Sequence, residues 1–169
     1  FDSAHAMGST YQERPVGGFG DVEIFSLSPT KLVVAAEGGV AIAKDEAAAR
    51  HFRIGRDYGN PGNYDCEFPG INARMSEFHA LPALESLRRL PENVERRRAA
   101  AARYAEGLSK IPGIGLQRLV AGGESTFKDF PVLVGAADFG LSRDQLAQAL
   151  QAENIMSRRY FYPALHQQQ

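Results

Sequence analysis

The first part of the chain alternates short apolar runs with glycine-rich turns, a pattern that predicts paired strands. Residues 21–26 (DVEIFS) have the composition of a strand, and residues 39–43 (GVAIA) form a second run entered through Gly38-Gly39. We expect the two runs to share a sheet. The segment between them is then a loop that leaves the end of one strand and returns at the start of the other.

Helical patterns follow. The acidic pair Asp45-Glu46 predicts the first turn of a helix that runs to about Arg56. Residues 57–71 are rich in glycine, proline and asparagine, which indicates an ordered loop or a mobile flap.

A long amphipathic pattern then runs from Met75 to about Leu108. Pro82 and Pro91 interrupt it, and each proline removes a backbone donor and clashes with the preceding turn. We therefore predict a kink near residue 82 and a break near residue 91, giving two helices at an angle.

The last part of the chain combines strand and helix signals. Residues 126–134 (TFKDFPVLV) predict a strand, at a sheet edge because of Pro131. Ser142 predicts the cap of a helix that runs to about Glu153, and residues 155–161 predict a further strand. Such an order after a long helix indicates a small α+β domain attached to a larger α/β one.

Composition excludes several classes of protein. The chain has 169 residues, 44% hydrophobic content and a net charge of −1, which suffices for a folded core but gives no field to attract nucleic acid or anionic lipid. Cys66 is the single cysteine, which fits a reducing compartment, and no apolar run approaches the roughly 20 residues that span a bilayer. We expect a cytoplasmic protein with neither nucleic-acid nor membrane partners. Because the sequence begins with Phe1, we expect it to be processed or cut from something longer.

The most informative residue is Lys31, which follows an apolar strand and precedes a glycine turn. A lysine that forms a Schiff base would sit at such a position, and Asp2 lies 29 residues upstream. Pyridoxal phosphate chemistry needs this pair, because an aspartate keeps the ring nitrogen protonated while a lysine carries the aldehyde. Taken singly, the lysine reads better as a solvated surface charge and the aspartate as an acidic residue near a strand end.

Six short motifs occur in one order along nearly the whole chain. They are Asp2-x-x-His5, Phe25-Ser26-x-x-x-x-Lys31, Glu37-Gly38-Gly39, Asn72-x-Arg74-Met75-Ser76-Glu77, Glu95-Arg96-Arg97-Arg98 and Tyr162-Pro163-x-Leu165-His166. In this order the chain resembles the DegT/DnrJ/StrS family of pyridoxal-phosphate (PLP) sugar aminotransferases.

The resemblance implies an α/β fold class, as part of the aspartate aminotransferase fold (fold type I). Residues 1–91 would be the C-terminal part of the PLP-binding large domain with its linking helix, and residues 92–169 part of the small α+β domain. The implied reaction transfers an amino group, with glutamate as the expected donor, to a nucleotide-linked keto sugar or related cyclic ketone for polysaccharide or antibiotic sugar biosynthesis. Such enzymes are homodimers with active sites at the subunit boundary. Lys31 argues against the family's dehydratase branch, whose members have histidine there.

The resemblance also assigns roles at the cofactor. Lys31 would form the Schiff base and later move a proton, and Asp2 would pair with the pyridine nitrogen. His5 would lie beside the phenolic oxygen, with a packed or exposed histidine as the equal alternative. Ser26 would bind the phosphate, a role that Ser28 fits equally well. No residue is assigned to a metal.

Further roles lie beyond the lysine loop. Asn72 would reach the partner subunit's cofactor phosphate, although an ordinary helix N-cap explains it equally well. The substrate-facing turn of the small domain would carry Tyr160, Tyr162 and His166, with an edge strand as the plainer alternative. Arg96, Arg97 and Arg98 are expected to form a solvated, salt-bridged helix face.

The resemblance also predicts what is missing. Family members carry a phosphate-binding turn and a stacking aromatic ring before the aspartate, and a closing segment of the small domain after the final histidine. We therefore expect this chain to be the middle of such an enzyme. The alternative is a catalytically silent fragment or a regulatory homologue that serves as a dimerisation scaffold.

Overall fold

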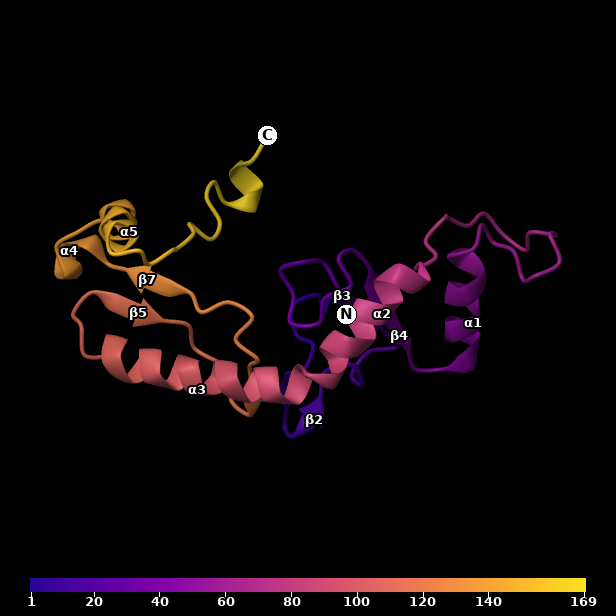
Figure 1. The fold of residues 1–169 in the computed structure, drawn as a ribbon, viewed down its shortest axis with the longest axis horizontal. Coiled ribbons are helices and arrows are strands. Elements are labelled where there is room, and N and C mark those ends of the chain that lie inside the picture. Colours follow the sequence, from indigo (N-terminus) through magenta and orange to yellow (C-terminus); the bar gives the residue numbers. More distant parts are fainter. The chain divides into compact units, whose positions relative to one another are not determined.

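The computed structural model describes residues 1–169 and has a mixed α/β fold (Figure 1). The strands are β1 (Thr10–Tyr11), β2 (Arg14–Pro15), β3 (Val22–Ser26), β4 (Gly39–Ala43), β5 (Ile114–Leu116), β6 (Gly123–Glu124) and β7 (Val132–Val134). The helices are α1 (Glu46–Gly55), α2 (Glu77–Arg88), α3 (Leu90–Leu108), α4 (Ala136–Phe139), α5 (Arg143–Ala152) and the 3-10 helix η1 (Leu165–Gln167). None of these helices combines the length and the apolar composition that a bilayer crossing requires.

The chain forms two compact units. Unit 1 contains residues 1–98 and 119–128, and unit 2 contains residues 99–118 and 129–169. Helix α3 therefore begins in unit 1 and ends in unit 2, and the chain returns to unit 1 once before finishing in unit 2. The predicted boundary between residues 91 and 92 concerns the domains of the family fold and stays a prediction.

Strands β3 and β4 form the antiparallel pair that carries the candidate site. Phe25 lies opposite Val40, and Ser26 lies opposite Gly39. Both predicted strands and their shared sheet are thus confirmed. The loop between them is anchored by buried apolar residues, Leu27, Val33 and Ala35, packed against Met7, Met75, Ala83 and Leu90.

A distant segment of sequence completes unit 1. Strand β6 pairs with β1 in a three-stranded sheet of order β2-β1-β6. The Thr10 hydroxyl donates to Oε2 of Glu124 at 3.1 Å, and Thr126 next to this strand has only 1% of its surface exposed. Residues 119–128 are thus built into the same body as the N-terminal strands.

Helices α1 and α5 begin where the sequence predicted them, at the acidic pair Asp45-Glu46 and at the capping residue Ser142. The Asp45 carboxylate accepts a hydrogen bond from the Ala48 backbone N–H at 2.8 Å, which caps α1. Ser142 and Gln145 form a reciprocal capping box at the start of α5. Each cap satisfies backbone donors that the first helical turn leaves unpaired.

The predicted irregular segment, residues 57–71, is an ordered loop held against α1. The rings of His51 and Phe68 stack with their centroids 4.2 Å apart. Arg50 donates two hydrogen bonds to the Glu67 carboxylate, which holds the pKa of that carboxyl below its ordinary value. These contacts between side chains of α1 and side chains of the loop therefore hold the loop in place.

The predicted break in the long helical pattern lies at Arg89, between α2 and α3. Helix α2 runs through Pro82 without ending, and α3 begins one residue before Pro91, where the missing N–H costs little. Figure 1 shows the two helices meeting at an angle.

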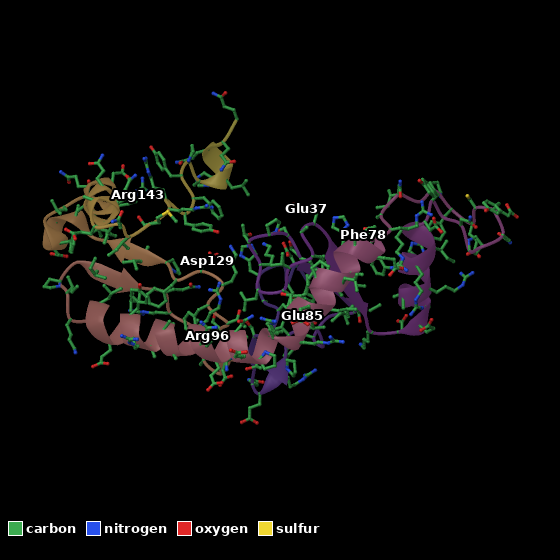
Figure 2. All side chains as sticks on the ribbon, viewed as in Figure 1. Glu37, Phe78, Glu85, Arg96, Asp129 and Arg143 are labelled. Carbon is green, nitrogen blue, oxygen red and sulfur yellow. The ribbon has the colours of Figure 1, made fainter.

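Figure 2 shows Phe78 and Glu85 projecting from α2. Its apolar side chains are largely exposed: Phe78, Leu81, Leu84 and Leu87.

The predicted solvated face of α3 holds for Arg96 and is wrong for its two neighbours. Arg96, which Figure 2 labels, makes an ion pair with Glu92 in the same helix at 3.9 Å. Nη1 of Arg97 and Nε of Arg98 instead donate to backbone carbonyls in residues 125–127, at 3.0 Å and 3.1 Å.

The prediction of a strand over residues 126–134 is mostly wrong. Only β7 forms there, and it pairs with β5 in antiparallel register. The preceding residues turn instead, because Phe127 has a φ of 48°, in the left-handed region, and Pro131 cannot donate to a ladder.

The strand predicted at residues 155–161 is absent. The Ile155 N–H donates to the Leu150 carbonyl at 2.8 Å and so continues the end of α5 instead of starting a strand. An extended segment becomes a strand only beside a partner, and none pairs with this segment.

Candidate active site around Lys31

The loop from Leu27 to Gly38 presents Lys31 at the end of β3. Its base is closed by two backbone hydrogen bonds, from Leu27 N–H to the Gly38 carbonyl at 2.9 Å and from Ala35 N–H to the Leu27 carbonyl at 2.8 Å. The Lys31 N–H donates to the Ser28 carbonyl at 3.0 Å, which turns the chain just after the strand. Lys31 is half-buried on a loop whose base is fixed by packing and hydrogen bonds.

Lys31 lines a small pocket within unit 1. The lining residues are Ala4, His5, Met7, Ser26, Lys31, Leu32, Val33 and Lys128. Three residues proposed from the sequence for cofactor binding, His5, Ser26 and Lys31, therefore meet here. Lys128 was not foreseen, since a lone lysine in a strand-like run carries no sign of its spatial neighbours.

Asp2 lies beside this pocket and not in its lining. It forms a parallel bridge with Ile24, and the Ser3 N–H donates to the Ile24 carbonyl at 2.9 Å. The Asp2 carboxylate is exposed and accepts a hydrogen bond from the Ala4 N–H at 3.0 Å. Because Ala4 belongs to the lining, one hydrogen bond links the Asp2 carboxylate to the pocket wall.

The two candidate serines for the phosphate occupy different places. Ser26 lies in the pocket lining, and Ser28 does not. Their hydroxyl oxygens are 3.3 Å apart, and the Ser28 N–H approaches Oγ of Ser26 at 3.4 Å. The position of Ser26 favours it for a ligand inside the pocket.

Glu23 holds the N-terminal segment against β3, a role that the sequence did not predict. Its side chain has 1% of its surface exposed and accepts hydrogen bonds from the backbone N–H groups of Gly20, Phe19 and Gly17 and from the Ser3 hydroxyl. These donors, led by Gly20, hold the pKa of Glu23 below its ordinary value despite burial. Through Ser3, the carboxylate ties the segment between Asp2 and Ala4 to β3.

Asn72 is not among the residues that line the Lys31 pocket. It is exposed and forms an isolated antiparallel bridge with Asp57. The alternative reading as a helix N-cap is wrong, because the N-cap of α2 is Ser76. The neighbouring Arg74 makes an ion pair with Asp57 at 3.3 Å, so it holds the loop end together.

The aromatic segment near the C-terminus belongs to unit 2. The ring centroids of Tyr160 and Phe161 are 4.2 Å apart, and the guanidinium of Arg143 lies 4.7 Å from the centroid of the Tyr162 ring. His166 is exposed in η1. The roles proposed for Tyr160, Tyr162 and His166 at the substrate stay predictions.

The gathered side chains fit PLP by their chemistry. The pocket offers a primary amine for an aldehyde, a hydroxyl for a phosphate oxygen and an imidazole for the phenolic oxygen. The Asp2 carboxylate, beside the wall, is the type of group that keeps a pyridine nitrogen protonated.

Comparison with known proteins identifies the family. The model described as the DegT/DnrJ/EryC1/StrS aminotransferase family matches residues 1–169. The chain belongs to this family, as its six motifs predicted.

Similar proteins extend the comparison. A dTDP-4-amino-4,6-dideoxy-D-glucose transaminase from Shigella dysenteriae is 32% identical, over 98% of this chain and 45% of the relative. A DegT DnrJ EryC1 StrS aminotransferase from Brucella abortus is 30% identical with a TM-score of 0.89, over 99% of this chain and 43% of that structure. The PLP form of Spr1654 from Streptococcus pneumoniae is 29% identical with a TM-score of 0.84, over 96% of this chain and 43% of that structure. The chain spans less than half the length of these proteins.

Proposed function

We propose that this chain carries the Schiff-base lysine of a PLP-dependent enzyme that transfers an amino group, from glutamate, to a nucleotide-linked keto sugar. The observation that carries the proposal is the meeting of Lys31, Ser26 and His5 in one pocket of a chain that belongs to a sugar aminotransferase family. The name of the Shigella relative supports a nucleotide-linked amino sugar as the product class. The finer fold assignment, part of a large and part of a small domain of fold type I, belongs to the same proposal, as does a cytoplasmic location.

In this proposal, PLP supplies an aldehyde and an electron-withdrawing ring that stabilises negative charge on the donor's α carbon. Lys31 holds the cofactor through Nζ and, once released, moves a proton at the donor's α carbon. Asp2 keeps the ring nitrogen protonated, and Ser26 donates its hydroxyl to a phosphate oxygen. His5 donates to the phenolic oxygen, and Asn72 serves the site of a second subunit in a homodimer.

The test is covalent trapping in a polypeptide of full family length that includes these residues. Incubation with PLP, borohydride reduction and peptide mapping should place the pyridoxyl group on Lys31. Lys31→Arg keeps the positive charge but should reduce the label to background, whereas the matched change Lys44→Arg should leave it intact. Label on Lys44 or Lys128 of the unaltered protein would sink the assignment.

A further inference from the structure

The segment that carries Asp2 is paired with β3 in parallel. Asp2 forms a bridge with Ile24. Two hydrogen bonds define the register of this bridge. The Ser3 N–H donates to the Ile24 carbonyl at 2.9 Å, and the Ile24 N–H donates to the Phe1 carbonyl at 3.0 Å. The carboxylate that the proposed function assigns to the cofactor thus depends on the pairing of a few residues.

This pairing decides which side of the two strands carries the Asp2 side chain. Side chains alternate along a strand, and paired residues of neighbouring strands project to the same side. Asp2 therefore shares a side with Ile24 and with Ser26, which lines the Lys31 pocket. A slip of one residue in the register would turn Asp2 to the opposite side.

Ser3 and Glu23 join the two strands on that opposite side. Both are buried, with 6% of the surface of Ser3 and 1% of the surface of Glu23 exposed. Oγ of Ser3 donates to Oε2 of Glu23 at 3.2 Å. A slip of one residue would turn the Ser3 hydroxyl away from Glu23, so this hydrogen bond selects the register in which Asp2 shares a side with the pocket.

Glu23 can fix the register because its carboxylate is held independently of Ser3. The Gly17 N–H donates to Oε2 at 2.8 Å, and the Gly20 N–H donates to Oε1 at 2.9 Å. The Phe19 N–H also donates to Oε1. Hydrogen bonds to an ionised acceptor are the stronger kind, so the turn before β3 orients both oxygens before the Ser3 hydroxyl reaches them.

We propose that the hydrogen bond between Ser3 and Glu23 is a register lock that positions Asp2 for its role at the pyridine nitrogen. Ser3 and Glu23 are positioning residues, since neither lines the Lys31 pocket. The hydrogen bond from the Ala4 N–H to the Asp2 carboxylate lies within one segment, so it cannot set the register. Only the purpose of the Asp2 carboxylate rests on the proposed function.

The first test measures amide hydrogen exchange in the 169-residue chain without cofactor. Ser3→Ala should speed exchange at residue 3 and at Ile24 by about tenfold relative to the Ala35 amide of the Lys31 loop, as expected for loss of a hydrogen bond to a charged group. The matched control is Thr10→Val, which removes a hydroxyl–carboxylate hydrogen bond between β1 and β6 and should leave both amides unchanged. Equal exchange in Ser3→Ala and the unaltered chain overturns the proposal, and so does unprotected exchange at both amides of the unaltered chain.

The second test asks whether the lock acts through Asp2. A polypeptide of full family length is loaded with PLP that carries ¹⁵N in the ring, and the ¹⁵N chemical shift reports protonation of that nitrogen. Ser3→Ala should lower the pKa of the ring nitrogen by about one unit, because a displaced carboxylate stabilises the pyridinium less. Asp2→Asn should lower this pKa further, and Ser3→Ala should then add nothing.

General destabilisation would not reproduce this pattern, and Thr10→Val should leave the pKa of the ring nitrogen unchanged. An unchanged pKa in Ser3→Ala overturns the positioning role, as does an equal decrease in the Asp2→Asn background. The exchange test needs no cofactor, so the two proposals can fail separately. A pyridoxyl label on Lys31 with unchanged exchange in Ser3→Ala rejects the register lock alone, whereas faster exchange without that label rejects the proposed function alone.

Discussion

Among single residues, Glu23 shows how one buried carboxylate organises several loops. Its partners are the Ser3 hydroxyl and the backbone N–H groups of three residues in the turn before β3, Gly17, Phe19 and Gly20. A sequence cannot reveal such a role, because a glutamate in a strand usually points to solvent. The donors that meet there come from loops whose course is set by the tertiary fold.

Glu23→Gln should therefore lower the thermal midpoint at neutral pH by about 5 °C, because an amide cannot accept from all these donors. The pKa of Glu23 in the folded chain lies below its ordinary value of 4.5, so the stabilisation is present above pH 4.5 and is lost as the pH falls through the folded pKa. The gap between the two proteins should close in acid. Midpoints measured from pH 7 to pH 3 check this, with the exposed Glu13→Gln as control; a gap independent of pH would contradict it.

Helices and strands could be predicted where neighbouring residues in the sequence determine the structure, as at glycine turns and helix starts. Strand composition and a glycine turn predicted β3 and β4, the acidic pair Asp45-Glu46 predicted the start of α1, and Ser142 predicted the cap of α5. The pairing of β6 with β1 could not be foreseen, because a two-residue strand has no pattern of its own and exists only beside its partner. The place of Lys128 in the pocket lining could not be predicted for a similar reason. The turn that carries it is held by hydrogen bonds from Arg97, which is distant in the sequence.

The loop 57–71 allows a controlled test of packing. Gly59 and Gly62 both have φ in the left-handed region, at 83° and 115°. A Cβ at Gly59 would collide with the Phe68 carbonyl, whereas one at Gly62 would meet nothing within 4 Å. Gly62→Ala should therefore cost only backbone strain, about 1 kcal/mol. Gly59→Ala should cost about 3 kcal/mol or open the loop.

Hydrogen exchange distinguishes the two changes. The Glu67 N–H donates to the Gly59 carbonyl at 2.9 Å, and the Tyr58 N–H donates to the Ile71 carbonyl at 3.0 Å. Both amides should lose protection in Gly59→Ala and keep it in Gly62→Ala. Equal protection in the two variants would mean that the close backbone approach does not hold the loop.

At the scale of the whole molecule, the role proposed for Asn72 bears on assembly. Under the proposed function, Asn72 serves the cofactor phosphate of a second subunit, and in its own chain it does not line the Lys31 pocket. Mixing Lys31→Ala and Asn72→Ala subunits of full family length should restore about a quarter of the unaltered activity by forming one intact site per mixed dimer. The control replaces Asn72→Ala with Asn63→Ala, which should be active without mixing. Mixed dimers that form but stay inactive would exclude a shared site.

The return of the chain from unit 2 to unit 1 has a consequence for how the protein is made. Unit 1 needs residues 119–128 for its third strand and for the buried Thr126, yet residues 99–118 of unit 2 are translated before them. Because synthesis proceeds from the N-terminus, unit 1 cannot finish folding until Lys128 has left the ribosome. The lining of the Lys31 pocket is complete only then, because it includes Lys128. A cut at residue 91 or 98 would leave the first part without Lys128, so the two units cannot be separated by dividing the gene once.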